Sequence, residues 1–286
     1  MRMINIALRV TLLISIIKEL VSFCLKSWNR KLKDGGTKMN KMRITFISDT
    51  HARHRSLKGT NDIRKSDESI DLPGGDLLVH AGDFMTSGYS KYEAEDFCNW
   101  LGDQDYDLCA FIAGNHDRLF EIDQETKSNL IKGLHYRIEY LEDSYLRYGD
   151  YYSENPITIY GSPWQPEFYN WAFNLPRGGK ELEEKWAKIP DNVDILITHG
   201  PPQDHLDVSG PPWNTPHLGC ELLRVRVDKI KPKIHVFGHI HGGYGYKFYN
   251  GTHFINASVL NERYDLVNPP ITVDWDPETN ELEFIK

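Results

Sequence analysis

The residues of this chain that could do chemistry occur in five short polar segments, which are far apart in the sequence. They are Asp49-Thr50-His51, Gly82-Asp83, Gly114-Asn115-His116-Asp117, His199-Gly200 and Gly238-His239-Ile240-His241. The segments offer carboxylate, amide and imidazole groups, a mixture of oxygen and nitrogen ligands that suits Mn²⁺, Fe or Zn²⁺ better than a soft metal ion. Each segment is common in isolation, so the prediction of a metal site depends on their occurring together.

Seven side chains in these segments are candidate metal ligands. They are Asp49, His51, Asp83, Asn115, His199, His239 and His241. A carboxylate has two oxygens, so Asp83 can lie between two cations. Two divalent metals about 3.5–4 Å apart would clamp a phosphoryl group and lower the pKa of a bridging water, which makes hydroxide available for in-line attack. The pattern therefore predicts a dinuclear centre that cleaves a phosphoester.

Each polar segment directly follows a short apolar run. The runs are Ile44–Ile47, Leu77–Val79, Ala110–Ala113, Asp194–Thr198 and Ile234–Phe237. Continuous apolar runs of this length indicate strands that are buried on both faces. Between them lie the expected helices, which are Lys91–Leu101, Gln124–Lys132, Lys180–Ile189 and Cys220–Ile230. This alternation predicts a largely parallel α/β arrangement, in which ligands bind beyond the carboxyl ends of the strands.

Further short strands indicate a second sheet packed on the first. They are expected at Ile157–Tyr160, Tyr246–Tyr249, His253–Asn256, Ile271–Trp275 and Leu282–Ile285.

The composition is typical of a soluble globular protein, with 40% hydrophobic and 26% charged residues. The net charge of −8 is uneven, because residues 1–43 carry ten Lys or Arg against two acidic residues, which leaves −16 for the remainder. An acidic body argues against binding of long nucleic acid, which normally needs a basic face. The four cysteines form no Cys-x-x-Cys pair, and this favours free thiols and a cytoplasmic location.

Residues 1–41 are expected to form an N-terminal extension and linker, and residues 42–286 a single domain. Segment 4–25 is apolar, but its longest uncharged run, from Val10 to Ile17, is too short to span a bilayer. A membrane-surface helix followed by basic residues is one interpretation of this extension. An unstructured extension without a structural role is the other, and the sequence leaves both open.

The ordered motifs resemble those of the calcineurin-like metallophosphoesterase superfamily. Asp-x-His, Gly-Asp, Gly-Asn-His-Asp, His-Gly and Gly-His-x-His occur here in that order. Within the superfamily, the chain is similar to the metallophosphoesterase-domain-containing, fetal-brain protein-like phosphodiesterases. The similarity extends from about Met42 to Asp274 and is strongest in Ile159-Tyr160-Gly161-Ser162-Pro163-Trp164, Phe173-Asn174-Leu175-Pro176-Arg177-Gly178, Thr198-His199-Gly200-Pro201-Pro202 and Phe254-Ile255-Asn256-Ala257-Ser258. It implies a two-sheet β-sandwich flanked by helices, the four-layer αββα fold of a calcineurin-like metallophosphoesterase domain.

The resemblance also implies a role for each polar residue. One metal would be held by Asp49, His51, Asp83 and His241, and the other by Asp83, Asn115, His199 and His239. Mn²⁺ is the expected metal, with Fe and Zn²⁺ as alternatives. His116 would assist the leaving oxygen, with Asp117 or a neighbour orienting its ring. One vertebrate branch of the subgroup has glycine in place of His239, whereas this chain keeps the histidine and therefore a complete ligand set.

Arg53, Arg177 and Trp164 are the candidate substrate contacts. Each has an alternative interpretation, because loop arginines are often solvated and aromatic residues often pack in a core. The same two alternatives, stacking on a nucleobase or packing in the core, apply to Phe168, Trp171 and Phe173.

The expected function is a phosphodiesterase that hydrolyses small phosphodiesters, with cyclic nucleotides as the leading class. A phosphomonoesterase or protein phosphatase is an alternative, because the same metals serve both reactions. A nuclease fits the acidic body less well. A non-catalytic scaffold with the same fold is a further alternative, although such scaffolds tend to lose the histidine that stands here as His116. The motifs do not specify the physiological substrate, the native metal pair or the oligomeric state.

Overall fold

The computed structural model describes residues 41–59, 70–149, 156–210 and 215–285. The predicted N-terminal extension lies outside these residues except for Lys41, and so does the membrane-surface helix expected within it. In the ranges that are described, every helix is too short or too polar to cross a lipid bilayer.

The five apolar runs are strands, as the sequence predicts. They are β1 (Met42–Ile47), β4 (Gly75–His80), β5 (Tyr106–Phe111), β11 (Ile195–Thr198) and β12 (Ile234–Phe237). Strand β5 differs most from its predicted range, since it begins four residues earlier and ends at Phe111. The amide of Ile112 still donates to His80 O, and the chain then turns into the Asn115 loop.

These strands are divided between two six-stranded sheets. The first sheet has the order β16-β15-β1-β4-β5-β6 and the second the order β13-β14-β12-β11-β8-β7. Strands β1, β4, β5 and β6 are parallel to one another, as are β8, β11, β12 and β14. The C-terminal strands do not form a sheet of their own, because β15 and β16 extend the first sheet whereas β13 and β14 extend the second.

The remaining strands are short. They are β2 (Leu57–Gly59), β3 (Ile70–Leu72), β6 (Ile138–Tyr140), β7 (Ser144–Tyr148), β8 (Ile157–Ser162), β9 (Gln165–Pro166), β10 (Asn174–Leu175), β13 (Gly245–Tyr249), β14 (Thr252–Asn256), β15 (Ile271–Asp276) and β16 (Glu281–Ile285). The described helices are α2 (Lys91–Gly102), α3 (Arg118–Ile122), α4 (Gln124–Lys132), α5 (Lys180–Ala187) and α6 (Glu221–Ile230), with 3-10 turns at His54–Ser56 and His241–Gly243. All four predicted helices are therefore present, and α3 is an addition.

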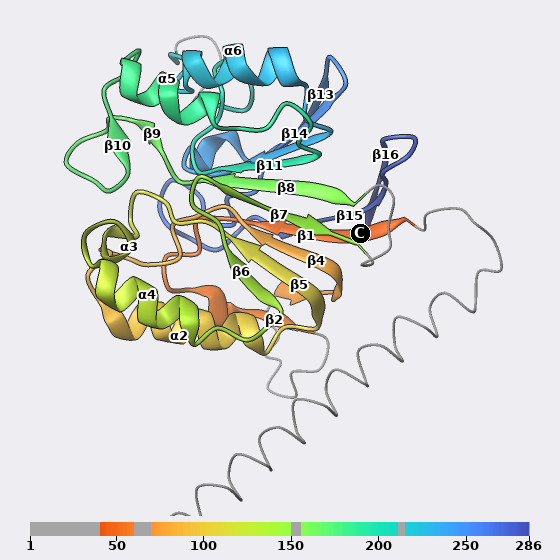
Figure 1. The fold of residues 1–286 in the computed structure, drawn as a ribbon. Helices are drawn as coiled ribbons and strands as arrows, with labels where there is room; N and C mark the ends of the chain where they lie inside the picture. The colour runs from red at the N-terminus through yellow and green to blue at the C-terminus, as the bar shows by residue number, and fades with distance from the viewer. Residues whose placement is uncertain (1–40, 60–69, 150–155, 211–214, 286) are drawn as a thin grey trace, which may run out of the picture. The chain divides into compact units, whose positions relative to one another are not determined.

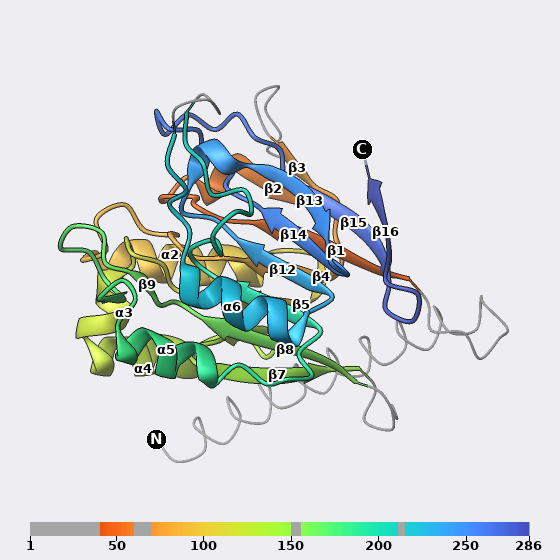
Figure 2. The same cartoon turned by 90° about the horizontal axis from the view of Figure 1, so that it is seen from above.

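The sheets and helices form four layers, which confirms the predicted αββα fold. Figure 1 shows α5 and α6 on the outer face of the second sheet and α2 and α4 on the outer face of the first. Figure 2, seen from above, shows α5 and α6 lying across the second sheet. One core, including Phe46, Ile197 and Trp275, lies between the sheets, and two others lie under the helices. The central strands of each sheet are buried on both faces because helices cover one face and the other sheet covers the second.

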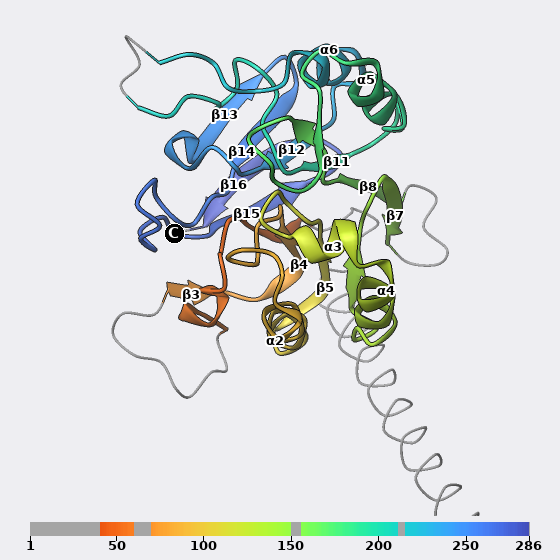
Figure 3. The same ribbon diagram turned by 90° about the vertical axis from the view of Figure 1, so that its left-hand side faces the viewer.

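The carboxyl ends of the parallel strands lie at one edge of the sandwich. Figure 3 looks onto this edge, where the loops after β4, β5, β11 and β12 face the viewer. Since every predicted ligand segment follows one of these strands or β1, the topology brings segments from both sheets to the same edge.

Close approach of the two sheets depends on Gly161 in β8. A Cβ atom there would overlap Leu141 Cβ and lie 2.6 Å from Ile112 Cγ2. We predict that Gly161→Ala lowers the free energy of unfolding by about 1–3 kcal/mol, because the added methyl group overpacks the core. Chemical denaturation measures this change. Gly102→Ala is the matched control, since its Cβ would meet no atom closer than 3.9 Å, and an equal loss in both variants would contradict the packing argument.

Candidate metal centre

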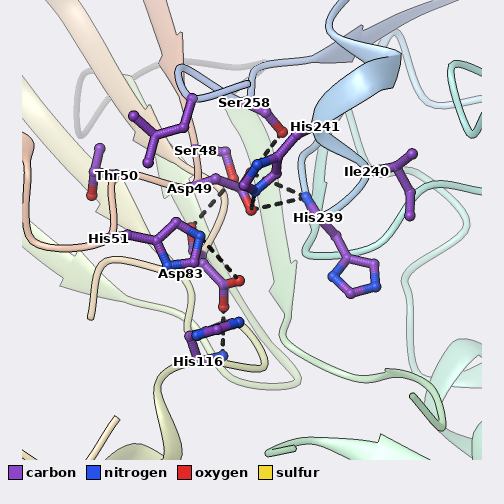
Figure 4. Close-up of polar contacts among 12 residues, drawn as sticks. Ser48, Asp49, Thr50, His51, Asp83, His116, His239, Ile240, His241 and Ser258 are labelled. Carbon is purple, nitrogen blue, oxygen red and sulfur yellow. Dashed lines mark hydrogen bonds and ion pairs between the residues drawn. The ribbon is translucent and has the colours of Figure 1, made fainter. Parts of the chain in front are cut away.

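Asp49, directly after β1, is a fully buried carboxylate surrounded by donors. Its Oδ1 and Oδ2 lie 3.1 and 3.0 Å from the backbone nitrogen of His239, and Ser258 Oγ donates to Oδ2 at 2.7 Å. His241 Nε2 lies 3.3 Å from Oδ1. Figure 4 shows these contacts converging on Asp49. A buried carboxylate needs such compensation, because burial of an unpaired charge is costly.

Asp83, after β4, lies between three other predicted site residues. Its Oδ1 accepts the backbone N–H of His116 at 2.7 Å. Its Oδ2 faces two imidazoles, with His199 Nε2 at 3.3 Å and His51 Nε2 at 3.8 Å. The position of this carboxylate between two imidazoles fits the shared role that the sequence predicts for Asp83.

Three of the imidazoles are anchored in the same way. The Nδ1 atoms of His51, His199 and His241 lie 3.2, 2.9 and 2.9 Å from the carbonyl oxygens of Met85, Ala81 and Asn261. Because a carbonyl oxygen can only accept a hydrogen bond, each Nδ1 carries the proton and each Nε2 faces the carboxylates. Metal-binding histidines commonly donate their other ring N–H to a carbonyl or a carboxylate in this manner.

The predicted ligands form two groups whose ligand atoms lie within 4.8 Å of one another. They are Asp49 with His51 and His241, and Asp83 with His199 and His239. Asn115 Oδ1 lies 2.9 Å from His199 Nε2 and so belongs to the second group. A third group joins His51, Asp83 and His116, which places His116 within reach of the same carboxylate. Figure 4 shows the rings of His51, His241 and His116 around the two carboxylates.

These residues fit divalent metal ions. The Nε2 atom of His51 is buried and has no hydrogen-bond partner among the described residues. A buried ring nitrogen that accepts nothing is costly unless it binds a further group, and the oxygens and nitrogens around it are ligands that Mn²⁺, Fe and Zn²⁺ share. The position of His239 is less constrained, since its ring contacts His199 at 5.0 Å and Phe168 at 5.9 Å between centroids.

The ionisation of the site is set by burial and by the two carboxylates. Burial lowers the pKa of His51 to about 4 and that of His239 to about 3, which keeps both rings neutral at pH 7. For His199 and His241, burial acts in the same direction, but Asp83 and Asp49 outweigh it and raise each pKa to about 9. Binding of a metal at these two rings therefore requires the loss of a proton that the carboxylates otherwise retain.

The ligand loops carry unusual backbone conformations. Asp49, His51, Asp83 and His239 have φ angles of 54°, 39°, 58° and 66°, a region that residues other than glycine seldom adopt. Each such conformation costs about 1–3 kcal/mol, and residues of this kind tend to occur at functional sites, where the surrounding structure holds them. These backbone conformations direct carboxylate and imidazole groups from different loops into one space.

His116 and Asp117 are both present at the site, with different surroundings. His116 is partly exposed, and its Nδ1 lies 2.5 Å from Thr86 O. Asp117 is fully buried, and its oxygens accept the N–H groups of Asp83, Met85 and Gly114 at 2.9, 2.9 and 2.7 Å. The backbone of Thr86 therefore contributes to the orientation of the His116 ring, whereas Asp117 holds the ligand loops together.

The structure gives the three candidate substrate contacts different surroundings. The guanidinium of Arg177 bonds to Leu218 O, Gly219 O and Glu221 through its two terminal nitrogens. Trp164 donates to Asp143 and lies under Lys185 Nζ at 3.7 Å from the ring centroid. Both side chains thus have partners within the protein, and a contact of either with substrate stays a prediction. Arg53 is exposed, two residues after His51, and its substrate contact stays a prediction.

Three residues contact the site in ways that the sequence did not predict, although Trp171 was a candidate for base stacking or core packing. Ser258 holds Asp49, and the only available signal was its place in the Phe254–Ser258 similarity segment. Tyr264 lies 5.0 Å from the ring of His51 and 5.3 Å from that of His241. The ring of Trp171 is stacked on His116 at 4.0 Å. No apolar run or motif points to the two aromatic residues, because both stand in irregular loops.

The αββα sandwich, with carboxylate, amide and imidazole groups at the carboxyl ends of its strands, is the arrangement that the motifs predict for a metal-dependent phosphoester hydrolase. Residues 42–243 match the family model described as calcineurin-like phosphoesterase. The chain belongs to the calcineurin-like phosphoesterase family and is a phosphoester hydrolase, as the motifs predicted. This family uses divalent metals, and the grouped ligands described above are candidates to hold them.

Relatives agree with the family assignment, and a solved structure agrees with the fold. The chain is 43% identical over 248 residues to metallophosphoesterase domain-containing protein 1 of Homo sapiens. This alignment covers 81% of this chain and 70% of the relative. It is 33% identical over 255 residues to UPF0046 protein C25E10.12 of Caenorhabditis elegans, covering 82% and 81%. The fold is similar to the crystal structure of the protein TT1561 of Thermus thermophilus, with a TM-score of 0.56, 14% identity and coverage of 86% and 99%.

Because Gly238 has no side chain, the Asp49 carboxylate can lie directly against its backbone. A Cβ atom at this position would overlap both Asp49 Oδ2 and Ser48 Oγ. We predict that Gly238→Ala displaces the Asp49 carboxylate and lowers the amount of divalent metal that the purified protein retains. Elemental analysis after loading with Mn²⁺ measures this loss. Gly200→Ala is the matched control, because it also adjoins a predicted ligand but its Cβ would meet no atom closer than 3.7 Å. Full metal content in Gly238→Ala would refute the prediction.

Proposed function

We propose that this chain is a dinuclear metal-dependent phosphodiesterase that hydrolyses small phosphodiesters, with cyclic nucleotides as the leading substrate class. The observation that carries the proposal is the shared anchoring of His51, His199 and His241. Each donates its Nδ1–H to a backbone carbonyl, and each Nε2 faces Asp49 or Asp83. This arrangement has two halves that share Asp83, which supports two ions rather than one.

The seven predicted ligands divide between two divalent ions. Asp49, His51 and His241 would hold one, Asn115, His199 and His239 the other, and Asp83 would contact both. Mn²⁺ is the metal we propose, with Fe and Zn²⁺ as alternatives, since all three accept mixed nitrogen and oxygen ligands. When bound, such a pair supplies positive charge to the phosphoryl oxygens and a nucleophile at neutral pH.

His116 is proposed to donate a proton to the leaving oxygen. Its backbone N–H is bonded to Asp83 Oδ1, and its ring lies 4.6 Å from that of His51, so the imidazole borders the ligand cluster. The bond between Nδ1 and Thr86 O leaves Nε2 to face the substrate. Asp117 acts on the loops: it bonds to the N–H groups of Asp83 and Gly114 and so sets the distance between them.

Charge balance favours a diester over a monoester. The predicted ligand set contains two carboxylates and five neutral groups, so the site with two divalent ions carries a moderate positive charge. A hydroxide nucleophile and a singly charged diester would neutralise it, whereas a doubly charged monoester would usually require additional cations. Arg177 is bonded to Glu221, and Arg118 donates to Asn170 O. Both arginines thus already donate within the protein, and the exposed Arg53 is the proposed phosphate contact.

Two partly exposed aromatic rings support a nucleotide substrate. Tyr264 is 43% exposed and packs beside His51 and His241, and Phe168 is 49% exposed and packs beside His239. They flank opposite parts of the ligand cluster, and either can stack on a planar base. The acidic body argues against long nucleic acid, so we propose a small soluble phosphodiester as the partner. Membrane contact through residues 4–25 and a cytoplasmic location stay predictions.

An activity panel separates the proposed function from its alternatives. With Mn²⁺, we expect hydrolysis of bis-aryl phosphates and of 2′,3′- or 3′,5′-cyclic nucleotides to exceed that of aryl monophosphates. His116→Ala should lower turnover by about 10²–10⁴-fold, the usual loss when general acid–base assistance is removed. It should leave the metal content unchanged.

The controls identify which alternative holds. Preferred cleavage of monophosphates would favour a phosphomonoesterase or protein phosphatase. No hydrolysis by metal-loaded protein would favour the scaffold, and unchanged turnover in His116→Ala would remove this residue from the mechanism.

The proposal that Asp83 contacts both metal ions has a separate test. Asp83→Ala should abolish retention of both metals, because each half of the ligand set loses a carboxylate. His241→Ala, the matched variant, removes a ligand from one half and should leave one ion bound. Elemental analysis of both variants under identical loading gives the stoichiometry, and circular dichroism checks that they are folded. One firmly retained ion in Asp83→Ala would show that Asp83 is not shared.

A further inference from the structure

The ring of Trp171 lies against the ring of His116. Their centroids are 4.0 Å apart and their planes differ by 26°, so the indole is stacked on one face of the imidazole. Trp171 is separated from His116 by more than fifty residues and stands in the irregular stretch between β9 and β10. No sequence motif connects the two side chains, and the contact exists only in the folded chain.

The segment around Trp171 is fastened to the His116 loop at several points. The backbone N–H of Ala172 donates to Asn115 O at 3.1 Å, and Arg118 donates to Asn170 O. The N–H of Phe173 donates to Glu121 Oε1 at 3.0 Å. These bonds lie on both sides of Trp171 in the sequence, so the indole is held in place on the imidazole and is not a freely moving surface side chain.

The other sides of the His116 ring are also in contact. Nδ1 is bonded to Thr86 O, and Thr86 is held in turn by Glu93 through bonds of 2.9 Å at its N–H and 2.7 Å at its hydroxyl. The ring of His51 meets that of His116 at 89°, edge to face. A single hydrogen bond at Nδ1 leaves the imidazole able to rock about its Cβ–Cγ bond, and a planar neighbour on its face restricts this motion.

We propose that Trp171 is a positioning residue for His116. It fixes the plane of the imidazole so that Nε2 is directed at the leaving oxygen of the substrate. This inference rests on the proposed function, because it assigns Trp171 an effect on the leaving-group step. Correct orientation of a proton donor contributes strongly to rate, and a displacement of about 1 Å can cost about 10²-fold.

The stacking can be tested without activity. In the protein loaded with diamagnetic Zn²⁺, the ring protons of His116 should show an upfield ring-current shift in ¹H NMR, with their signals assigned by their absence in His116→Ala. Trp171→Ala should abolish the upfield shift and Trp171→Phe should retain part of it. Tyr169→Ala is the control from the same loop, since Tyr169 is 78% exposed and its ring meets that of Phe168 edge to face instead. Unchanged His116 signals in Trp171→Ala would overturn the proposal whatever the activity.

The effect on catalysis is read from a leaving-group series. On methyl aryl phosphodiesters with leaving groups from 4-nitrophenol to phenol, Trp171→Ala should lower kcat by about 10- to 100-fold for phenol and much less for 4-nitrophenol. The reason is that departure of a poor leaving group, such as phenol, depends most on protonation of its oxygen by His116. KM should change little, Trp171→Phe should restore part of the rate, and Trp171→Ala should cause no further loss in the His116→Ala background.

The outcomes distinguish this inference from the function on which it rests. An equal loss for all leaving groups, or losses that add to those of His116→Ala, would overturn the positioning role while hydrolysis by the unmodified chain still supports the phosphodiesterase. Absence of hydrolysis by the unmodified chain would instead refute the proposed function and with it the catalytic role of Trp171.

Discussion

The structure depends on the burial of two carboxylates, Asp49 and Asp83, at the edge of the sandwich. Removing a charge from water is costly, and it is tolerated only where donors and cations surround it. The surrounding groups come from distant parts of the chain, including Ser258, the backbone of His239 and the backbone of His116. The glycines beside the ligands follow from the same constraint, since a Cβ atom at Gly114 would overlap Asp83 Oδ1 and lie 2.6 Å from His199 Cε1.

The site is shared between the two sheets, and this makes the packing of the sandwich part of its chemistry. The first sheet contributes Asp49, His51, Asp83 and Asn115, and the second contributes His199, His239 and His241. Neither sheet alone holds a complete set of ligands for either proposed ion. The core between the sheets therefore sets the separation of the ligands, which links stability of the fold to the geometry of the metal centre.

Around this centre, the contacts divide the polar and aromatic residues into groups with different tasks. The histidines that face the carboxylates are fixed by backbone carbonyls, and Asp117 fixes the loops that carry them. His116 is also bonded to a backbone carbonyl, that of Thr86, but its ring is stacked on Trp171 and remains partly exposed. A site with rigid ligands and one accessible imidazole fits a phosphoester hydrolase better than a scaffold, whose surface would need neither.

Sequence patterns are enough to predict the residue types of the site, the apolar runs that precede them and, through the order of the motifs, the family and its fold. Local patterns suffice for these features because strands, helices and turns reflect periodicity and backbone preference. The folded chain was needed to show how the strands are divided between the sheets, and that Arg177 and Trp164 make packing and loop contacts. It also brought Ser258, Tyr264 and Trp171 to the ligands. These contacts join residues in irregular loops, where no periodicity relates sequence position to place in space.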